Sequence, residues 1–66
     1  MTPTQREVFS LLFSGGPHHM RRMSHLLNHD RKTIERNVYQ LEKRGLIVTR
    51  IDGCARECRV APWTLL

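Results

Sequence analysis

Residues 31–47, RKTIERNVYQLEKRGLI, decide the fold of this 66-residue chain. At about 100° per residue, Ile34, Val38 and Leu41 fall on one face of a helix, with Asn37 beside that face. The opposite face carries Lys32, Arg36, Tyr39 and Lys43, with Thr33 and Gln40 next to them. The spacing therefore predicts a helix that is buried on one side and presents cations, an amide and a phenol on the other.

Local signals mark both ends of this helix. Asp30 precedes it as an N-cap, and its carboxylate is expected to accept hydrogen bonds from free backbone N–H groups. Gly45 stands where a helix commonly ends through a left-handed residue. The helix is therefore predicted to run from about Arg31 to Arg44.

Size and charge limit what the chain can be. Its length suits one small domain, and its formal net charge is +5 with a pI near 10.3. Ten of the eleven Lys and Arg residues lie between Arg21 and Arg59. Such a balance indicates an anionic partner, most often nucleic acid and sometimes a membrane surface. No segment has the length of a membrane span or the layout of a signal peptide, so we expect a cytoplasmic protein.

Two shorter segments precede the long helix. Thr2, Pro3 and Gln5 form a helix start with a capping box, and Gly15-Gly16-Pro17 ends that first helix. Its apolar face contains Val8, Leu11 and Leu12, widened by Phe9 and Phe13. Residues 18–27 predict either a second, shorter helix or a brief extended segment followed by one. A tight turn at residues 28–30 follows, in which Asn28 can adopt the left-handed conformation.

After Gly45 the pattern changes to that of a β-hairpin. Residues 46–51 are rich in β-branched side chains and predict a strand, Asp52-Gly53 predicts a turn, and residues 57–60 predict a second strand. Strand alternation places Arg50 opposite in sense to Ile47 and Ile51, so Arg50 is expected to be exposed. The final apolar residues are expected to pack the open end of the core: Trp63, Leu65 and Leu66.

This order of elements resembles a winged helix-turn-helix domain, an α+β fold of three helices followed by a two-stranded β-hairpin wing. Residues 23–47 are similar to the helix-turn-helix of bacterial and phage regulators, including multiple-antibiotic-resistance-type repressors. Those families share an apolar residue at the Ile34 position and an ending of the form Leu-Glu-Lys-Arg-Gly-Leu-Ile, here residues 41–47. We expect one domain over residues 1–66, with the helix-turn-helix at about 18–44 and the wing at about 46–61.

The resemblance implies that the third helix enters the major groove of DNA, with its N-terminal residues nearest the bases. Arg can make two hydrogen bonds to guanine, Gln can do so to adenine, and Lys or Thr can reach phosphate. By position, the DNA-facing set on this helix is Arg31, Lys32, Thr33 and Arg36, with Gln40 and Lys43 further along. Glu35 lies among them and either accepts from cytosine or pairs with Lys32 or Arg31, and the pairing is favoured.

The wing and the turn supply further candidates for DNA contact. Arg56, near the hairpin tip, is the best candidate for a phosphate or minor-groove contact. Arg50 and Arg59 lie on the flanking strands, and for Arg59 plain solvation is favoured. His29, in the turn before the third helix, is a candidate phosphate contact.

A partial resemblance to Z-DNA-binding alpha domains rests on Tyr39 and on Pro62-Trp63. Those domains rely on an Asn four residues before the Tyr, where this chain has Glu35. A carboxylate would repel a phosphate backbone there, and the wing also lacks their paired prolines. This subtype is therefore disfavoured.

Cysteines and histidines offer alternative sites of other kinds. Cys54 and Cys58 lie near the hairpin tip, where Arg56 and Arg59 are able to lower a thiol pKa and where a disulfide across the hairpin is conceivable. The favoured alternative is that they are reduced, small apolar fillers. The four histidines lack the paired spacing of a zinc site, so we expect no metal and no cofactor. No catalytic arrangement is present, so we expect no enzyme.

The sequence thus predicts a small, sequence-specific protein that binds double-stranded DNA. Its length suggests a transcriptional regulator from a phage, plasmid or mobile element, and a repressor, an excision factor or a replication regulator all fit. Met1 beside a helix cap suggests an authentic N-terminus. We expect a homodimer or a cooperative array, with contacts from Phe9 or Phe13 or from residues 63–66. The alternative is a protein-interaction module, of antirepressor or inhibitor type, that binds an acidic surface of a host protein.

Overall fold

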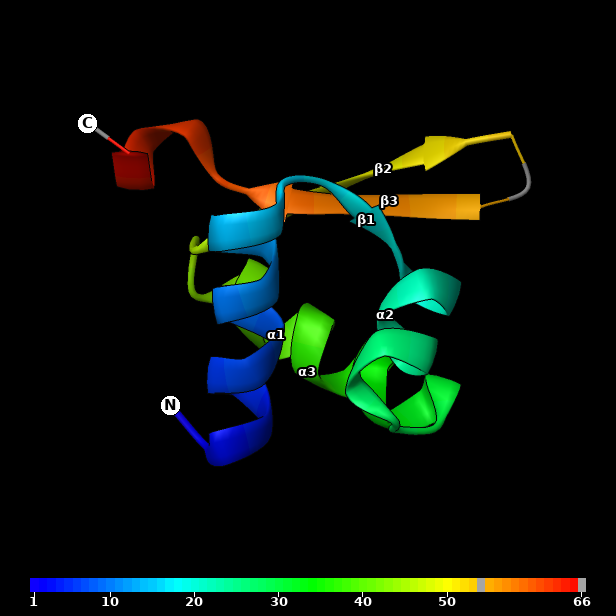
Figure 1. The fold of residues 1–66 in the computed structure, drawn as a ribbon. Coiled ribbons are helices and arrows are strands. Elements are labelled where there is room, and N and C mark those ends of the chain that lie inside the picture. The colour runs from blue at the N-terminus through cyan, green and yellow to red at the C-terminus, as the bar shows by residue number, and fades with distance from the viewer. Residues whose placement is uncertain (54, 66) are drawn as a thin grey trace.

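Three helices lie beside a small antiparallel sheet in the computed structural model, which describes residues 1–53 and 55–65 (Figure 1). The elements follow in the order α1 (Pro3–Gly15), β1 (His18–His19), α2 (Met20–Leu27), α3 (Arg31–Lys43), β2 (Ile47–Asp52), β3 (Ala55–Val60) and a 3-10 turn η1 (Pro62–Leu65). The β2–β3 hairpin runs across one end of the helices, and its tip extends past α2 (Figure 1). The predicted fold, three helices and a hairpin wing, is confirmed.

The sheet has one strand more than the sequence predicted. Its order is β1-β3-β2, and both pairings are antiparallel. The hairpin register runs from Ile47 opposite Val60 to Asp52 opposite Ala55, while β1 places His18 opposite Cys58. Residues 18–27 therefore form an extended segment followed by a helix, the second of the two predicted alternatives. A two-residue strand has no periodicity of its own, so its pairing with β3 could not be predicted.

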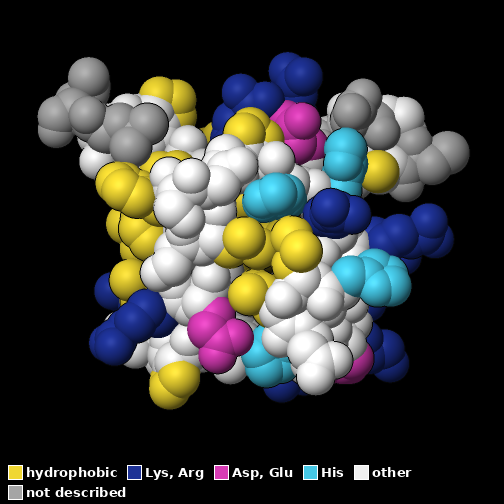
Figure 2. Space-filling model, in the orientation of Figure 1, with side chains coloured by type: hydrophobic (Ala, Val, Ile, Leu, Met, Phe, Trp, Pro, Cys, Tyr) yellow, Lys and Arg dark blue, Asp and Glu magenta, His cyan; other side chains and the backbone are white. Residues whose placement is uncertain are grey.

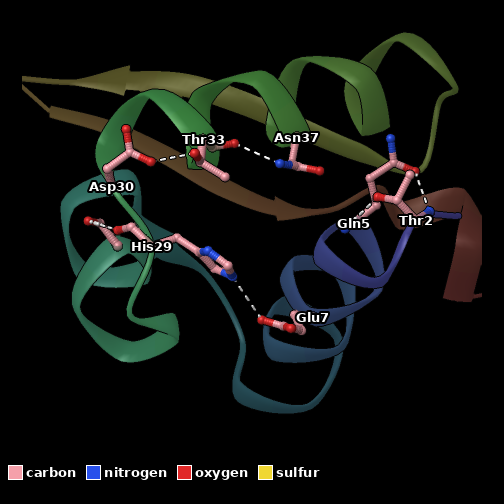
Figure 3. A network of polar contacts seen from close by, with 8 residues as sticks. Thr2, Gln5, Glu7, His29, Asp30, Thr33 and Asn37 are labelled. Atoms are coloured by element: carbon pink, nitrogen blue, oxygen red, sulfur yellow. Dashed lines mark hydrogen bonds and ion pairs between the residues drawn. The ribbon is translucent and has the colours of Figure 1, made fainter.

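The helix ends are formed by the residues that the sequence indicated. The Thr2 hydroxyl accepts a hydrogen bond from the Gln5 N–H, and the Gln5 side chain accepts one from the Thr2 N–H, each at 3.2 Å (Figure 3). Asn28 is left-handed, with φ 57°. After α3, Gly45 has φ 78° and its N–H donates to the Glu42 carbonyl at 2.9 Å. The Leu46 N–H donates to the Leu41 carbonyl at 3.0 Å, which completes a Schellman motif.

The core lies between the helices and the inner face of the hairpin. The predicted apolar face of α3 is buried: Ile34, Val38 and Leu41 are each 0 or 1% exposed. These side chains pack in one cluster with Val8, Leu12, Met20, Met23, Ile47, Cys58 and Val60. Asn37 is also buried, and its amide donates to the Thr33 carbonyl at 2.7 Å, so its burial leaves that donor satisfied.

Two expectations about packing were wrong. Trp63 is 58% exposed, and its indole N–H donates to the Gly45 carbonyl at 2.7 Å, so it ties η1 to the end of α3 instead of filling the core. Ile51 is 74% exposed, because the hairpin at this point has run out beyond the helices (Figure 1). Phe13, which widens the apolar face of α1 and was also a candidate dimer contact, is 57% exposed and stacks on Phe9, with 5.9 Å between the ring centroids. The predictions for the Leu65 side chain and for Leu66 lie outside what the structure describes.

In the described part of the chain, no helix has the length and apolar character needed to cross a membrane.

Candidate nucleic-acid interface

An open groove of about 770 Å³ separates α3 from the hairpin. From α3 it is lined by Arg31, Lys32, Glu35, Arg36, Val38, Tyr39 and Glu42, and from the rest of the chain by Met20, Ile51, Gly53, Ala55 and Arg56. Burial of Ile34, Val38 and Leu41 fixes the rotation of α3, and burial of Ile47 and Cys58 fixes the base of the hairpin. The core thus sets the basic side of α3 beside the wing.

The two carboxylates in the groove are already engaged. The Glu35 carboxylate lies 3.2 Å from Arg31 Nε, four residues back on the same helix, so the predicted helix pairing is confirmed. Glu42 accepts a hydrogen bond from the Thr49 hydroxyl at 2.8 Å. Lys32, Arg36 and Arg56 form no ion pair with any other described residue. The groove therefore offers three unneutralised cations, two from α3 and one from the wing.

Five predicted contact residues lie outside this groove. The Gln40 amide oxygen accepts a hydrogen bond from the Gln5 amide of α1 at 2.5 Å, and the Thr33 hydroxyl donates to the Asp30 carboxylate. Lys43 is exposed in the last turn of α3. The remaining two contact carboxylates: the His29 ring lies 3.2 Å from the Glu7 carboxylate, and Arg50 forms an ion pair with Glu57 at 3.6 Å.

Two of these departures, Gln40 and His29, have partners distant in sequence. Gln40 and His29 both turn toward α1, whose position relative to α3 no helical periodicity describes. Arg59 also pairs with Glu57, at 2.5 Å. Conversely, Tyr39 lines the groove and is 62% exposed, although it was not among the selected contact residues. The sequence did indicate this position, because Tyr39 lies on the same face of α3 as Lys32, Arg36 and Lys43.

A polar network fixes the turn before α3 (Figure 3). The Ser24 hydroxyl donates to the His29 carbonyl at 2.6 Å, and the His29 ring lies 3.2 Å from the Glu7 carboxylate of α1. Asp30 stands at the N-cap as predicted, but its side chain caps no backbone N–H. It accepts instead from the Thr33 hydroxyl, and this hydrogen bond lowers the pKa of Asp30. The network anchors the start of α3 to both α2 and α1.

Cys58 does not have the environment of a redox sensor. Its side chain is fully buried, and this burial raises the pKa of the thiol to about 12, against the opposing influence of Arg56. Arg56 does lower the thiol pKa, but desolvation of the thiolate outweighs its attraction, so Cys58 is the small apolar filler that the sequence favoured. Cys54 lies outside the described residues, as does the proposed disulfide.

We expect Cys58 to resist alkylation while the protein is folded. In a Cys54→Ser variant at pH 8, iodoacetamide should modify Cys58 at least about tenfold more slowly in the folded protein than in urea. Folding keeps the reagent away from the sulfur and disfavours the reactive thiolate. Since the folded pKa lies above the ordinary value of 9.0, this thiol also removes stability as the pH rises from about 9 toward 12. Equal alkylation rates in the folded and unfolded protein would contradict the buried position.

No metal centre is formed by the described residues, which contain no group of three or more His, Cys, Asp or Glu side chains able to hold an ion.

Solved structures with the same fold are transcriptional regulators. The PcaV transcriptional regulator from Streptomyces coelicolor superposes with a TM-score of 0.89 at 26% identity, over 98% of this chain and 48% of that one. A possible transcriptional regulator for arsenical resistance gives 0.86 at 30% identity, over 97% and 66%. This chain is a winged helix-turn-helix domain. A transcriptional regulator from Thermotoga maritima shares the fold, with a TM-score of 0.84 at 22% identity over 97% and 47%.

This chain spans about half the length of PcaV and of the Thermotoga protein. Neither a protein-family model nor a curated protein sequence matches the chain. The comparisons thus show that this fold occurs in transcriptional regulators, and the contact residues are argued from the groove.

Proposed function

We propose that this winged-helix domain binds double-stranded DNA sequence-specifically as part of a transcriptional regulator. In this proposal α3 lies in the major groove, and the hairpin lies on the adjacent backbone or minor groove. One observation carries it: Lys32 and Arg36 of α3 and Arg56 of the wing line one open groove, and none is neutralised by a described carboxylate. A strand of DNA backbone between a helix in one groove and a wing in the next would meet all three cations.

Each groove residue has a chemical role in this proposal. Arg36 can make paired hydrogen bonds to a guanine edge, while Lys32 and Arg56 can neutralise phosphates. Glu35 holds the Arg31 side chain by its pairing and thereby restricts which base or phosphate Arg31 reaches. The exposed Tyr39 hydroxyl is a further donor on the same wall. His29, Thr33, Gln40, Lys43 and Arg50 are left out of the proposed contact set, since they do not line the groove.

The alternative partner is an acidic surface on a host protein, which would use the same cations. A protein partner requires only the helix or only the wing, whereas a duplex requires both together. The groove combines both elements, which favours DNA. A repressor role, a cytoplasmic location and a phage, plasmid or mobile-element origin stay predictions from the sequence.

Selection from a random pool of duplexes tests sequence-specific binding. The proposal predicts an enriched motif of a few base pairs, bound at least about 10³-fold more tightly than mixed duplex, as is usual for specific DNA binding. The duplex should be compared with a single strand of the same sequence. Uniform recovery of all sequences, or a preference for the single strand, would contradict it.

We further propose that the domain forms a homodimer through α1. Phe13 is 57% exposed and stacks on the half-buried Phe9, and Figure 2 shows hydrophobic side chains gathered along the α1 edge of the molecule, away from the hairpin tip. A two-fold arrangement would pair two recognition helices and double a short footprint. It would also cover an aromatic pair that a soluble monomer leaves in water.

Phe13→Asp should convert such a dimer to a monomer, because a charge would be buried at the aromatic contact. Sedimentation equilibrium should give about twice the chain mass for the parent protein and the chain mass for the variant. Ser14→Asp, an exposed neighbour on the same helix, serves as the control for added charge. A parent protein that sediments as a monomer on its own and on DNA would contradict the proposal.

A further inference from the structure

The tip of the wing projects past the last position that the core covers. On the inner face of the hairpin, β2 contributes Ile47, Thr49 and Ile51, because alternate residues of a strand share one face. Ile47 is 1% exposed and Ile51 is 74% exposed, so burial ends between them, at Thr49. Beyond this position the hairpin tip extends past α2 (Figure 1). The core therefore places the base of the wing, and its tip needs another support.

The tip carries the cation that the wing supplies to the proposed DNA contact. Thr49 lies opposite Cys58, and Ile51 lies opposite Arg56. Ile51 and Arg56 thus form the row that follows Thr49 on the same face, and both line the groove between α3 and the hairpin, which we call the α3–wing groove. The next row along a strand is about 7 Å away, at about 3.3 Å per residue. Any tilt of the hairpin therefore moves Arg56 relative to the cations of α3.

A hydrogen bond between side chains joins α3 to the wing at this point. The Thr49 hydroxyl donates to the Glu42 carboxylate at 2.8 Å. Glu42 is exposed in the last turn of α3 and lines the α3–wing groove, and Thr49 is half-buried. The bond thus links the two walls of the groove at the last covered row of the hairpin.

The turn between α3 and β2 is held from its other side by η1 and the residue before it. The Trp63 indole N–H donates to the Gly45 carbonyl at 2.7 Å, and the Ala61 N–H donates to the Leu46 carbonyl at 3.0 Å. These bonds fix the turn and the start of β2. The bond from Thr49 acts further along the strand, where it constrains the angle between the hairpin and α3.

We propose that Glu42 and Thr49 are positioning residues for DNA binding, whose hydrogen bond holds the wing where Arg56 meets the same backbone strand as α3. The proposal rests on the proposed function, since it takes the duplex to be the ligand. A wing that is already in place loses less conformational freedom on binding, which strengthens the complex. The bond also keeps the Glu42 carboxylate directed to the hairpin and away from phosphates, which it would repel.

A double-mutant cycle with Arg56 tests the positioning role. Thr49→Val replaces the hydroxyl with a methyl group, so it should weaken binding to mixed duplex about three- to tenfold at 0.1 M salt, the range expected when a segment has to be ordered on binding. In an Arg56→Ala background the same change should alter the affinity by less than about 1.5-fold, because the contact that it positions is already absent. Fluorescence anisotropy measures all four proteins. An equal loss in both backgrounds, or no loss in either, would overturn the proposal.

Glu42→Gln separates the hydrogen bond from the charge. Glutamine keeps an acceptor oxygen for Thr49 and removes a negative charge from the groove, so this variant should bind duplex at least as tightly as the parent protein. The matched control is Thr4→Val, the same substitution on α1 at a position that does not line the groove, and it should bind as the parent does. A Glu42→Gln variant as weak as Thr49→Val would overturn the role of the hydrogen bond.

The outcomes separate this proposal from the function on which it rests. If the parent protein fails to bind duplex, both fail. If it binds, and Arg36→Ala and Arg56→Ala weaken it while Thr49→Val does not, only the positioning role fails.

Discussion

Arg36→Ala and Arg56→Ala should each weaken duplex binding roughly tenfold at 0.1 M salt, the expected loss for one backbone contact. Arg36 lies on the basic wall of α3 and Arg56 on the wing across the groove, and neither is paired within the described chain. Each variant should remove about 0.9 from the salt slope if the lost contact is to phosphate. If Arg36 instead reads a guanine, its variant should also lose about 1–3 kcal/mol of discrimination at one base pair.

The matched control is Arg44→Ala, which removes the same charge. Arg44 is exposed at the C-cap of α3 and does not line the α3–wing groove, so the affinity of the variant should change by less than about twofold, a screened long-range effect. Fluorescence anisotropy on labelled duplex, at several salt concentrations, measures all three variants. Arg36→Ala and Arg56→Ala that bind as the control does would contradict the placement of DNA in the α3–wing groove.

Leu41→Ala should abolish folding or nearly so. Leu41 is 0% exposed in the core that fixes α3, and removing a fully buried leucine costs about 2–5 kcal/mol. A core in a domain of this size supplies only about 3–5 kcal/mol of net stability. The variant should therefore be largely unfolded at 37 °C, with loss of helical circular dichroism and of DNA binding together.

Leu26→Ala supplies the comparison for the same chemical change. Leu26 is 49% exposed on α2, so its truncation should cost less than about 1 kcal/mol and leave a cooperative urea transition. Urea unfolding followed by circular dichroism measures both variants. If Leu41→Ala and Leu26→Ala unfolded at the same urea concentration, Leu41 would not be the core residue described.

Local chemistry made much of the fold predictable. The capping box at Thr2, the left-handed residues Asn28 and Gly45, and the apolar face of α3 all depend on residues within a few positions of one another. Each formed as expected, with Asp30 the exception, since it keeps the N-cap position but bonds the Thr33 hydroxyl instead of the backbone. The hairpin also depends on residues close in sequence. Both predicted strands formed, and only their ends differ from the prediction, since β2 is Ile47–Asp52 and β3 is Ala55–Val60.

What the sequence did not predict depends on contacts between distant segments. The strand β1 exists only because β3 pairs with it, and Trp63 is directed outward by its hydrogen bond to Gly45. Ile51 follows the alternation of a strand but lies past the last helix that could cover it. Periodicity describes one element at a time, so it contains no information on where a neighbouring element ends.

The same distinction between local and distant contacts applies to the residues of the candidate site. Arg31, Lys32, Arg36 and Arg56 were selected from the stripe and the wing, and the fold brings them to one groove. Gln40 and His29 were selected by the same reasoning, yet both bond residues of α1.

The most direct test of the central claim is a titration of the parent protein against mixed duplex DNA at several salt concentrations. We predict binding at low salt and a straight log–log dependence with a negative slope of at least about 1.8 in magnitude, since Lys32 and Arg56 would each contribute about 0.9, and of about 2.7 if Arg36 also contacts phosphate. Absence of binding at low salt, or an affinity independent of salt, would contradict it. The basic groove would then have to serve an acidic protein surface.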